Sequence, residues 1–235
     1  MKHETPLAAP RRCRHGLSNP SRLGWHRMAW LGAMLVALSG CAPLAVVISV
    51  FKDTRTPAEY PYLEKSRVAV VVASEAGTFA SDSDVLLGRE ISQLMQANVS
   101  KIRMVSTDEV MQWTREDALD TLDISLLRSK LKADAIVVVE VRDLTLRDGP
   151  TLYRGQSNSA VAVYDQQHGD IATFRREFPN LVFPTSSISA SEINEGRFKR
   201  LYLEVLARRV SRAFYPYEPN EDVGLDAKTI SAAGS

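Results

Sequence analysis

The chain has 235 residues, of which 45% are hydrophobic and 24% charged, and its formal net charge at neutral pH is +1. This length supports one domain with a substantial hydrophobic core, and less readily two. With two cysteines and four histidines, the chain has little material for thiol catalysis or for metal sites built from these residues.

The first forty residues have the parts of a secretory signal. A short apolar run, Met28–Leu38, ends in small residues and follows a basic segment that contains Arg11, Arg12, Arg14, Arg22 and Arg27. The run is too short to span a bilayer, which takes about 20 apolar residues. A secreted precursor is therefore predicted, with residues 1–40 as the signal.

The sequence Leu38-Ser39-Gly40-Cys41 closes this segment and resembles the bacterial lipobox. The resemblance implies cleavage between Gly40 and Cys41, followed by attachment of acyl chains such as palmitate to Cys41. Two or three chains make a stable anchor where one does not. Because Ala42 rather than an aspartate follows the cysteine, the resemblance favours the outer membrane, on its periplasmic side, over the inner membrane. The alternative is a chance match within an uncleaved anchor or a buried helix.

Processing at Cys41 changes the composition of what remains. The mature part would hold 195 residues, with 23 basic and 27 acidic side chains and a net charge of −4. This mildly acidic balance gives no electrostatic reason to expect nucleic-acid binding. His168 would be the only histidine and Cys41, acylated, the only cysteine. A cysteine nucleophile, a Cys/His zinc site and a two-histidine metal site are thereby excluded, and no cofactor is expected.

The beginning of the mature chain is predicted to connect the lipid to a domain. Residues 42–51 are apolar and lie either in the membrane interface or in an early strand of the fold. Residues 52–64 contain Pro57 and Pro61 and indicate a linker. Together, residues 41–64 are expected to form the lipidated N-terminus and a tether that holds the domain off the membrane.

The first part of the domain alternates strands and helices. Arg67–Ala73 is a β-branched run typical of a strand buried on both faces. A helix capped by Ser81 or Ser83 follows, before a short strand over Lys101–Val105. The predicted apolar stripe of this helix is Leu87, Ile91, Leu94, Met95 and Asn98.

Two further helices are predicted before the next buried strand. Ser106 and Glu109 have the spacing of a capping box, which predicts a helix carrying Val110, Met111 and Trp113. Asp123 is expected to cap a short helix with Ile124, Leu127 and Leu131 on its inner side. Ala135–Val141 should then form a second buried strand parallel to the first.

The C-terminal part favours antiparallel strands and one long helix. A turn at residues 147–150 leads to Gln156–Tyr164, whose alternation predicts a half-exposed strand. Ile171–Phe178 is expected at the sheet edge, residues 179–189 in a loop, and Ser191–Tyr215 in the longest helix. The predicted fold class is α/β (α+β), a single mixed sheet of about five strands in the order β-α-β-α-α-β-β-β-α, spanning residues 65–217. Residues 218–235 should form a flexible tail.

Two sets of charged residues are candidates for function. Arg197, Arg200, Arg208 and Arg212 of the last helix could bind an anionic lipid or an acidic partner, or could form a solvated face paired with Glu204. The second set could include a catalytic carboxylate pair, although such acids are usually a solvated helix end. Its members are Glu116, Asp117, Asp120 and Asp123.

The order of elements resembles a group of envelope proteins that includes the TolB N-terminal domain, the penicillin-binding-protein activator lipoproteins and the curli secretion lipoprotein. The segments that carry the resemblance are Val68–Val72, Val85–Val99, Ala133–Val137, Tyr153–Phe178 and Ser191–Tyr215. The resemblance implies a protein that binds partners, activates envelope enzymes or builds secretion complexes and is not itself an enzyme.

The predicted function is therefore a lipid-anchored, periplasm-facing, non-enzymatic lipoprotein that binds an envelope protein or assists envelope assembly. One alternative is a subunit of an outer-membrane secretion complex. Spanning hairpins would need strands of about 9–11 residues, and only Tyr153–Tyr164 approaches that length. The other alternative is an envelope hydrolase that uses carboxylates.

Overall fold

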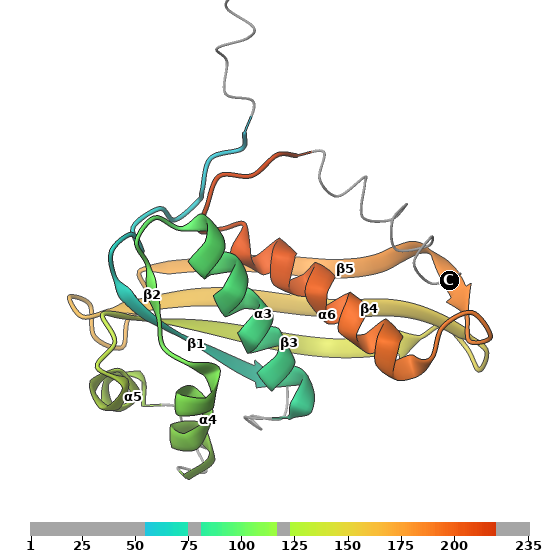
Figure 1. Cartoon of the computed structure of the whole chain (residues 1–235), viewed down its shortest axis with the longest axis horizontal. Helices are drawn as coiled ribbons and strands as arrows, with labels where there is room; N and C mark the ends of the chain where they lie inside the picture. The colour runs from blue at the N-terminus through green and yellow to red at the C-terminus, as the bar shows by residue number, and fades with distance from the viewer. Residues whose placement is uncertain (1–54, 75–80, 117–122, 220–235) are drawn as a thin grey trace, which may run out of the picture. The chain divides into compact units, whose positions relative to one another are not determined.

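The computed structural model describes residues 55–74, 81–116 and 123–219 (Figure 1). The helices in these ranges are α3 (Asp82–Asn98), α4 (Thr107–Glu116), α5 (Ile124–Leu131) and α6 (Glu195–Ser211). The strands are β1 (Arg67–Ser74), β2 (Arg103–Met104), β3 (Ala135–Arg147), β4 (Leu152–Asp165) and β5 (Phe174–Ser189). The predicted signal, Gly40, Cys41 and residues 42–51 lie outside the described residues.

The strands form one mixed sheet in the order β2-β1-β3-β4-β5. β1 pairs in parallel with β2 and β3, whereas β3, β4 and β5 pair antiparallel. The predicted α+β class and the predicted order of strands and helices are confirmed. α3 and α6 lie side by side across one face of the sheet (Figure 1), and α4 and α5 cover part of the other face.

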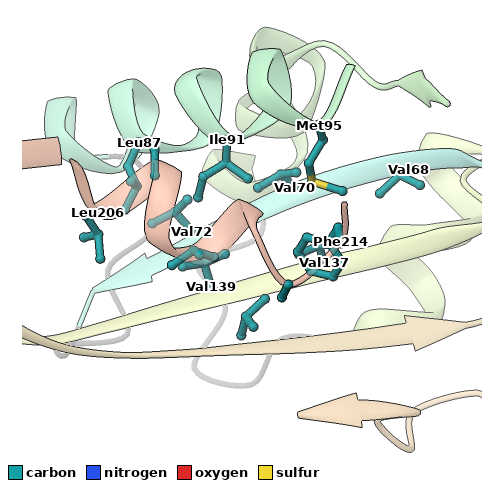
Figure 2. Packing of buried hydrophobic residues seen from close by; sticks show 14 of the residues in the cluster. Val68, Val70, Val72, Leu87, Ile91, Met95, Val137, Val139, Leu206 and Phe214 are labelled. Carbon is teal, nitrogen blue, oxygen red and sulfur yellow. The ribbon is translucent and has the colours of Figure 1, made fainter. Parts of the chain in front are cut away.

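The main core lies between the sheet and the pair α3 and α6 (Figure 2). Leu87, Ile91 and Met95 of α3 repeat every four residues and point at valines of β1, as the apolar stripe predicts. Leu206 and Phe214 reach the same core from the C-terminal part of the chain. Asn98 at the end of the predicted stripe is exposed, because α3 ends there and Val99 takes the buried position.

The predicted starts of α3 and α5 agree with the observed caps. The hydroxyl of Ser81 accepts the backbone N–H of Asp84 at 3.3 Å, and the Asp84 carboxylate accepts the backbone N–H of Ser81 at 3.0 Å. Asp123 caps α5, and Ile124, Leu127 and Leu131 are buried, as predicted. α6 is shorter than predicted and begins after Asn194, whose side chain caps it.

The antiparallel strands are longer than the sequence predicts. β3, β4 and β5 have 13, 14 and 16 residues, and β5 includes the segment predicted as a loop. Pro179 and Pro184 mislead the prediction because proline is excluded from central strands but tolerated at a sheet edge, where β5 lies. The prediction of an edge strand is correct, although the strand begins at Phe174 rather than Ile171.

β4 is buried on both faces near its end, so the prediction of a half-exposed strand is wrong there. Val161 and Val163 pack into the main core. On the opposite face Ala160 and Ala162 are 6% and 3% exposed. An ion pair of 3.6 Å between Glu140 of β3 and Arg175 of β5 crosses β4 and covers these small side chains.

The segment Arg55–Ser66, here called the strap, packs against the domain. The backbones of Thr56 and Tyr217 exchange two hydrogen bonds of 2.8 and 3.1 Å, and the N–H of Tyr60 donates to Ala213 O at 2.8 Å. Leu63 is 2% exposed. The folded unit therefore begins before the predicted boundary at residue 65, because the strap buries apolar side chains that a free linker would leave in water.

Candidate binding groove

A groove of about 550 Å³ opens between the strap and the turn that follows β4. Its walls come from segments that are far apart in the sequence and meet where β1 and β3 begin. The strap contributes Tyr60, Tyr62, Leu63 and Ser66. The remaining lining residues are Asp134, Ala135, Asp165, Gln166, Gln167, His168 and Thr173.

One wall carries an exposed aromatic ring on a buried support. The Tyr62 side chain is 76% exposed, and its ring meets Tyr60 edge-on with centroids 5.3 Å apart. Tyr60 in turn lies 5.2 Å from Phe174, which contacts Phe214 of the core at 6.3 Å. The hydroxyls of Tyr60 and Thr173 are also 3.3 Å apart. Tyr62 is therefore held in place although most of its surface is in water.

The opposite wall is a turn organised by Asp165. One carboxylate oxygen accepts the backbone N–H groups of Gln167 at 3.0 Å and His168 at 2.9 Å, and contacts His168 Nδ1 at 2.8 Å. Burial raises the pKa of Asp165, but the hydrogen bonds from His168 and Gln167 outweigh it and leave the pKa below its ordinary value. Because Nδ1 faces Asp165, the far side of the imidazole, Nε2, is the side available to a ligand.

The second carboxylate of the groove is also occupied within the protein. Asp134 accepts the backbone N–H of Arg67 at 2.6 Å and forms an ion pair with Arg103 at 3.6 Å. Ser66 donates its hydroxyl proton to the carbonyl of Glu64 at 3.4 Å rather than to His168. The groove thus offers neutral hydrogen-bonding groups and an aromatic surface rather than an activated nucleophile.

The predicted arginine set does not form one exposed surface. Arg197 and Arg200 are exposed at the start of α6, whereas Arg208 is partly buried and pairs with Glu204 at 3.2 Å. Arg212 is 4% exposed, and its guanidinium lies 4.6 Å from the centre of the Tyr217 ring. The predicted alternative, pairing with Glu204, is present for Arg208. Of the set, Arg197 and Arg200 face solvent.

Of the predicted carboxylate set, Asp123 is the residue whose side-chain contact the structure describes, and it caps a helix. Asp123 accepts the backbone N–H of Leu126 at 2.8 Å as the cap of α5. Glu116 is the last residue of α4, while Asp117 and Asp120 lie outside the described residues. In the described ranges, histidine, cysteine, aspartate and glutamate side chains form no group of three placed to hold a metal. None of the helices described here combines the length and apolarity needed to cross a membrane.

Sequence reasoning missed the groove because its lining is discontinuous. Two signals pointed towards it: His168 is the only histidine after Cys41, and Tyr60 and Tyr62 flank a proline. Neither shows that the strap folds back beside the turn.

The fold and the groove define a class: an α+β domain with a mixed five-stranded sheet and a polar surface groove with one aromatic wall. No family model and no curated protein matches the sequence. Among solved structures, the chain is similar to lipoprotein GNA1162 from Neisseria meningitidis, with 9% identity, a TM-score of 0.39, and coverage of 62% of this chain and 98% of that one.

Two further structures show likeness of the same degree. The PelC dodecamer from Paraburkholderia phytofirmans has 10% identity and a TM-score of 0.39, covering 68% of this chain and 95% of that one. A minor lipoprotein from Acinetobacter baumannii has 14% identity and a TM-score of 0.35, covering 64% and 90%. Several structural neighbours are thus bacterial lipoproteins.

Proposed function

We propose that this protein is a lipid-anchored, non-enzymatic binding factor of the bacterial cell envelope. Acyl chains on Cys41 hold it to the outer membrane, and the domain faces the periplasm. The observation that carries the proposal is that the strap, which follows Cys41 in the chain, forms one wall of the groove. The segment that leads to the anchor and the segment that shapes the groove are continuous.

This continuity supports a membrane-proximal binding site. Residues 42–54 separate Cys41 from the strap. Even fully extended, a segment of that length reaches roughly 45 Å. The start of the strap would stay within that distance of the bilayer surface, which keeps the domain near the membrane, where an anchored protein meets envelope partners.

The chemistry of the groove supports binding rather than catalysis. Its carboxylates, Asp134 and Asp165, hold backbone N–H groups and basic side chains of the protein itself. A general acid or base has to exchange protons with a substrate, and both carboxylates are already engaged in structural hydrogen bonds.

Membrane attachment is tested by replacing Cys41 with alanine in the full-length chain. The variant should not incorporate labelled palmitate and should keep its signal, whereas the wild type should incorporate palmitate, lose residues 1–40 and sediment with outer membranes. Cys13→Ala is the matched control, because Cys13 precedes the predicted cleavage site and should not affect attachment. Incorporation of palmitate into Cys41→Ala at the wild-type level would overturn the proposal.

Partner binding is tested by crosslinking in intact cells with a photoreactive residue at Tyr62 or at Arg200. Tyr62 probes the groove and Arg200 the exposed start of α6. Leu126, which is 46% exposed on α5, serves as the control position. A protein captured from Tyr62 or Arg200 but not from Leu126 would identify the envelope partner and the surface that binds it.

A subunit of a secretion complex is the second candidate, and one observation favours it. β3, β4 and β5 have 13, 14 and 16 residues, more than the roughly 9–11 residues that a membrane-spanning strand needs. Against it, the face of these strands away from α6 carries the charged residues Arg142, Arg175 and Glu177. A large oligomer on size-exclusion chromatography of a detergent extract would favour this candidate, and a monomer would count against it.

A further inference from the structure

We propose that the groove binds a neutral carbohydrate chain, with the Tyr62 ring as the surface on which one sugar stacks. This inference deepens the proposed function by naming the class of ligand for the same site. It rests on the proposed function only for the cellular location of the ligand, because the groove itself is formed within the described domain.

The Tyr62 ring is exposed to solvent and yet held in place by the protein. An aromatic side chain that is 76% exposed has no role in the core, yet this one is held by Tyr60 and, through it, by Phe174. A ring fixed before binding loses little conformational entropy when a ligand stacks on it. The C–H groups of a pyranose present an apolar face that fits the negative face of such a ring.

Polar side chains that can hydrogen-bond a ligand line the groove together with that ring. Gln166 and Gln167 offer side-chain amides, and His168 offers Nε2. Amides donate and accept at once, which matches sugar hydroxyls that also do both. A few polar groups beside an apolar surface are the usual means by which a small-molecule site fixes orientation.

The charge of the groove lining limits which ligands it can accept. The lining of the groove contains no lysine or arginine and includes the two carboxylates Asp134 and Asp165. A phosphate, a carboxylate or an anionic lipid headgroup would lack a cationic partner there and would meet negative charge. A cationic ligand would find Asp134 already paired with Arg103 and Asp165 already hydrogen-bonded to His168. The ligand class that fits this lining is therefore uncharged.

An extended peptide fits the groove less well than a sugar does. A peptide that adds to a sheet needs free backbone N–H and C=O groups along an edge. In the strap, the N–H groups of Tyr60, Lys65 and Ser66 already donate to Ala213, Ser100 and Leu63. These three N–H groups are therefore not open to a peptide strand. The volume of about 550 Å³ lies within the range of about 300–1,000 Å³ found for small-molecule sites.

The test measures binding of neutral oligosaccharides to the mature lipidated chain by titration calorimetry. The probes are chitotetraose and cellotetraose, with an oligogalacturonate as the anionic counterpart and octa-alanine as the extended peptide. The detergent must be a polyoxyethylene, because the headgroups of sugar detergents would compete for the groove.

Wild type should bind at least one neutral probe and neither counterpart. Tyr62→Ala should raise its Kd by about tenfold, as expected for loss of a stacking ring, whereas Tyr62→Phe should bind as the wild type does. Ile171→Ala is the matched control, since Ile171 is 73% exposed close in sequence to the groove turn but absent from its lining.

The inference is overturned if no neutral probe binds, if Tyr62→Ala binds as tightly as the wild type, or if the peptide or the anionic probe binds preferentially. These outcomes are separate from failure of the proposed function. Loss of sugar binding in Tyr62→Ala leaves palmitate incorporation at Cys41 intact, and failure of the acylation test leaves the sugar-binding result unchanged.

Discussion

At the scale of the residue, the contact between Gly155 and Tyr202 sets how closely α6 approaches β4. A Cβ at residue 155 would lie 2.0 Å from Cδ2 and 2.4 Å from Cε2 of the Tyr202 ring, which is fully buried. Gly155→Ala should therefore lower the free energy of unfolding by about 3 kcal/mol, because the ring cannot move out of a packed core without strain. Urea denaturation followed by circular dichroism measures this loss.

A second glycine provides the control for that substitution. A Cβ at Gly196, in the first turn of α6, has Asn194 Oδ1 as its nearest neighbour, at 3.7 Å. Gly196→Ala should leave stability unchanged or raise it by up to about 1 kcal/mol through helix propensity. Equal effects of the two substitutions would show that Tyr202 does not rest on Gly155 in solution.

The Tyr202 hydroxyl makes stability depend on pH in the alkaline range. It donates to Ser157 Oγ at 2.7 Å, and burial raises the pKa of Tyr202 to about 12. A folded pKa above the unfolded value of about 10 means that stability is complete below pH 10 and falls as pH rises towards 12. The loss should approach about 3 kcal/mol.

The measurement compares unfolding of the wild type and Tyr202→Phe between pH 9 and 12. At pH 9 the free energy of unfolding of the phenylalanine variant should be lower than that of the wild type by about 1 kcal/mol, because the hydroxyl hydrogen bond is lost. Its free energy of unfolding should then fall less steeply as the pH rises. Parallel declines would show that another group controls alkaline unfolding.

At the scale of the element, the start of α3 distinguishes two serines that the sequence leaves equivalent. Ser81 exchanges hydrogen bonds with Asp84, whereas Ser83 lies within the first turn of the helix. Ser81→Ala should cost about 1 kcal/mol and Ser83→Ala less than about 0.5 kcal/mol in chemical denaturation. The reverse order of losses would move the helix start by two residues.

Elements whose signals are local were predictable from the sequence. The β-branched runs of β1 and β3 and the cap residues Ser81 and Asp123 act within a few residues of chain, so their positions and order follow directly. The extent of β5 was not predictable, because the tolerance of Pro179 and Pro184 depends on β5 lying at the sheet edge. That position is a property of the whole sheet.

At the scale of the whole molecule, the groove could not be predicted because it depends on two chain segments meeting. Pro57 and Pro61 indicate a linker when read alone. Only the docking of the strap beside the β4–β5 turn gives Tyr62 its support and His168 its opposite wall. Lipid attachment at Cys41 is predicted by a local sequence motif. The groove depends on contacts between distant segments, so no local motif predicts it.

Leu63 tests whether the strap is part of the folded unit. It is 2% exposed and packs in the main core. Leu63→Ala should cost about 3 kcal/mol, because it removes buried apolar surface and leaves a cavity. The substitution should also loosen the strap, so that trypsin cleaves after Lys65 faster than in the wild type.

Glu59→Ala is the matched control, since it removes only an exposed ion pair of 3.1 Å with Arg176. Such pairs contribute about 0–1 kcal/mol, so neither stability nor cleavage should change much. If Leu63→Ala resembles Glu59→Ala, residues 55–64 act as the free tether that their composition suggests, and the groove has no fixed wall. If Leu63→Ala alone loosens the strap, the same variant should weaken ligand binding at Tyr62, because the ring is held in place through the strap.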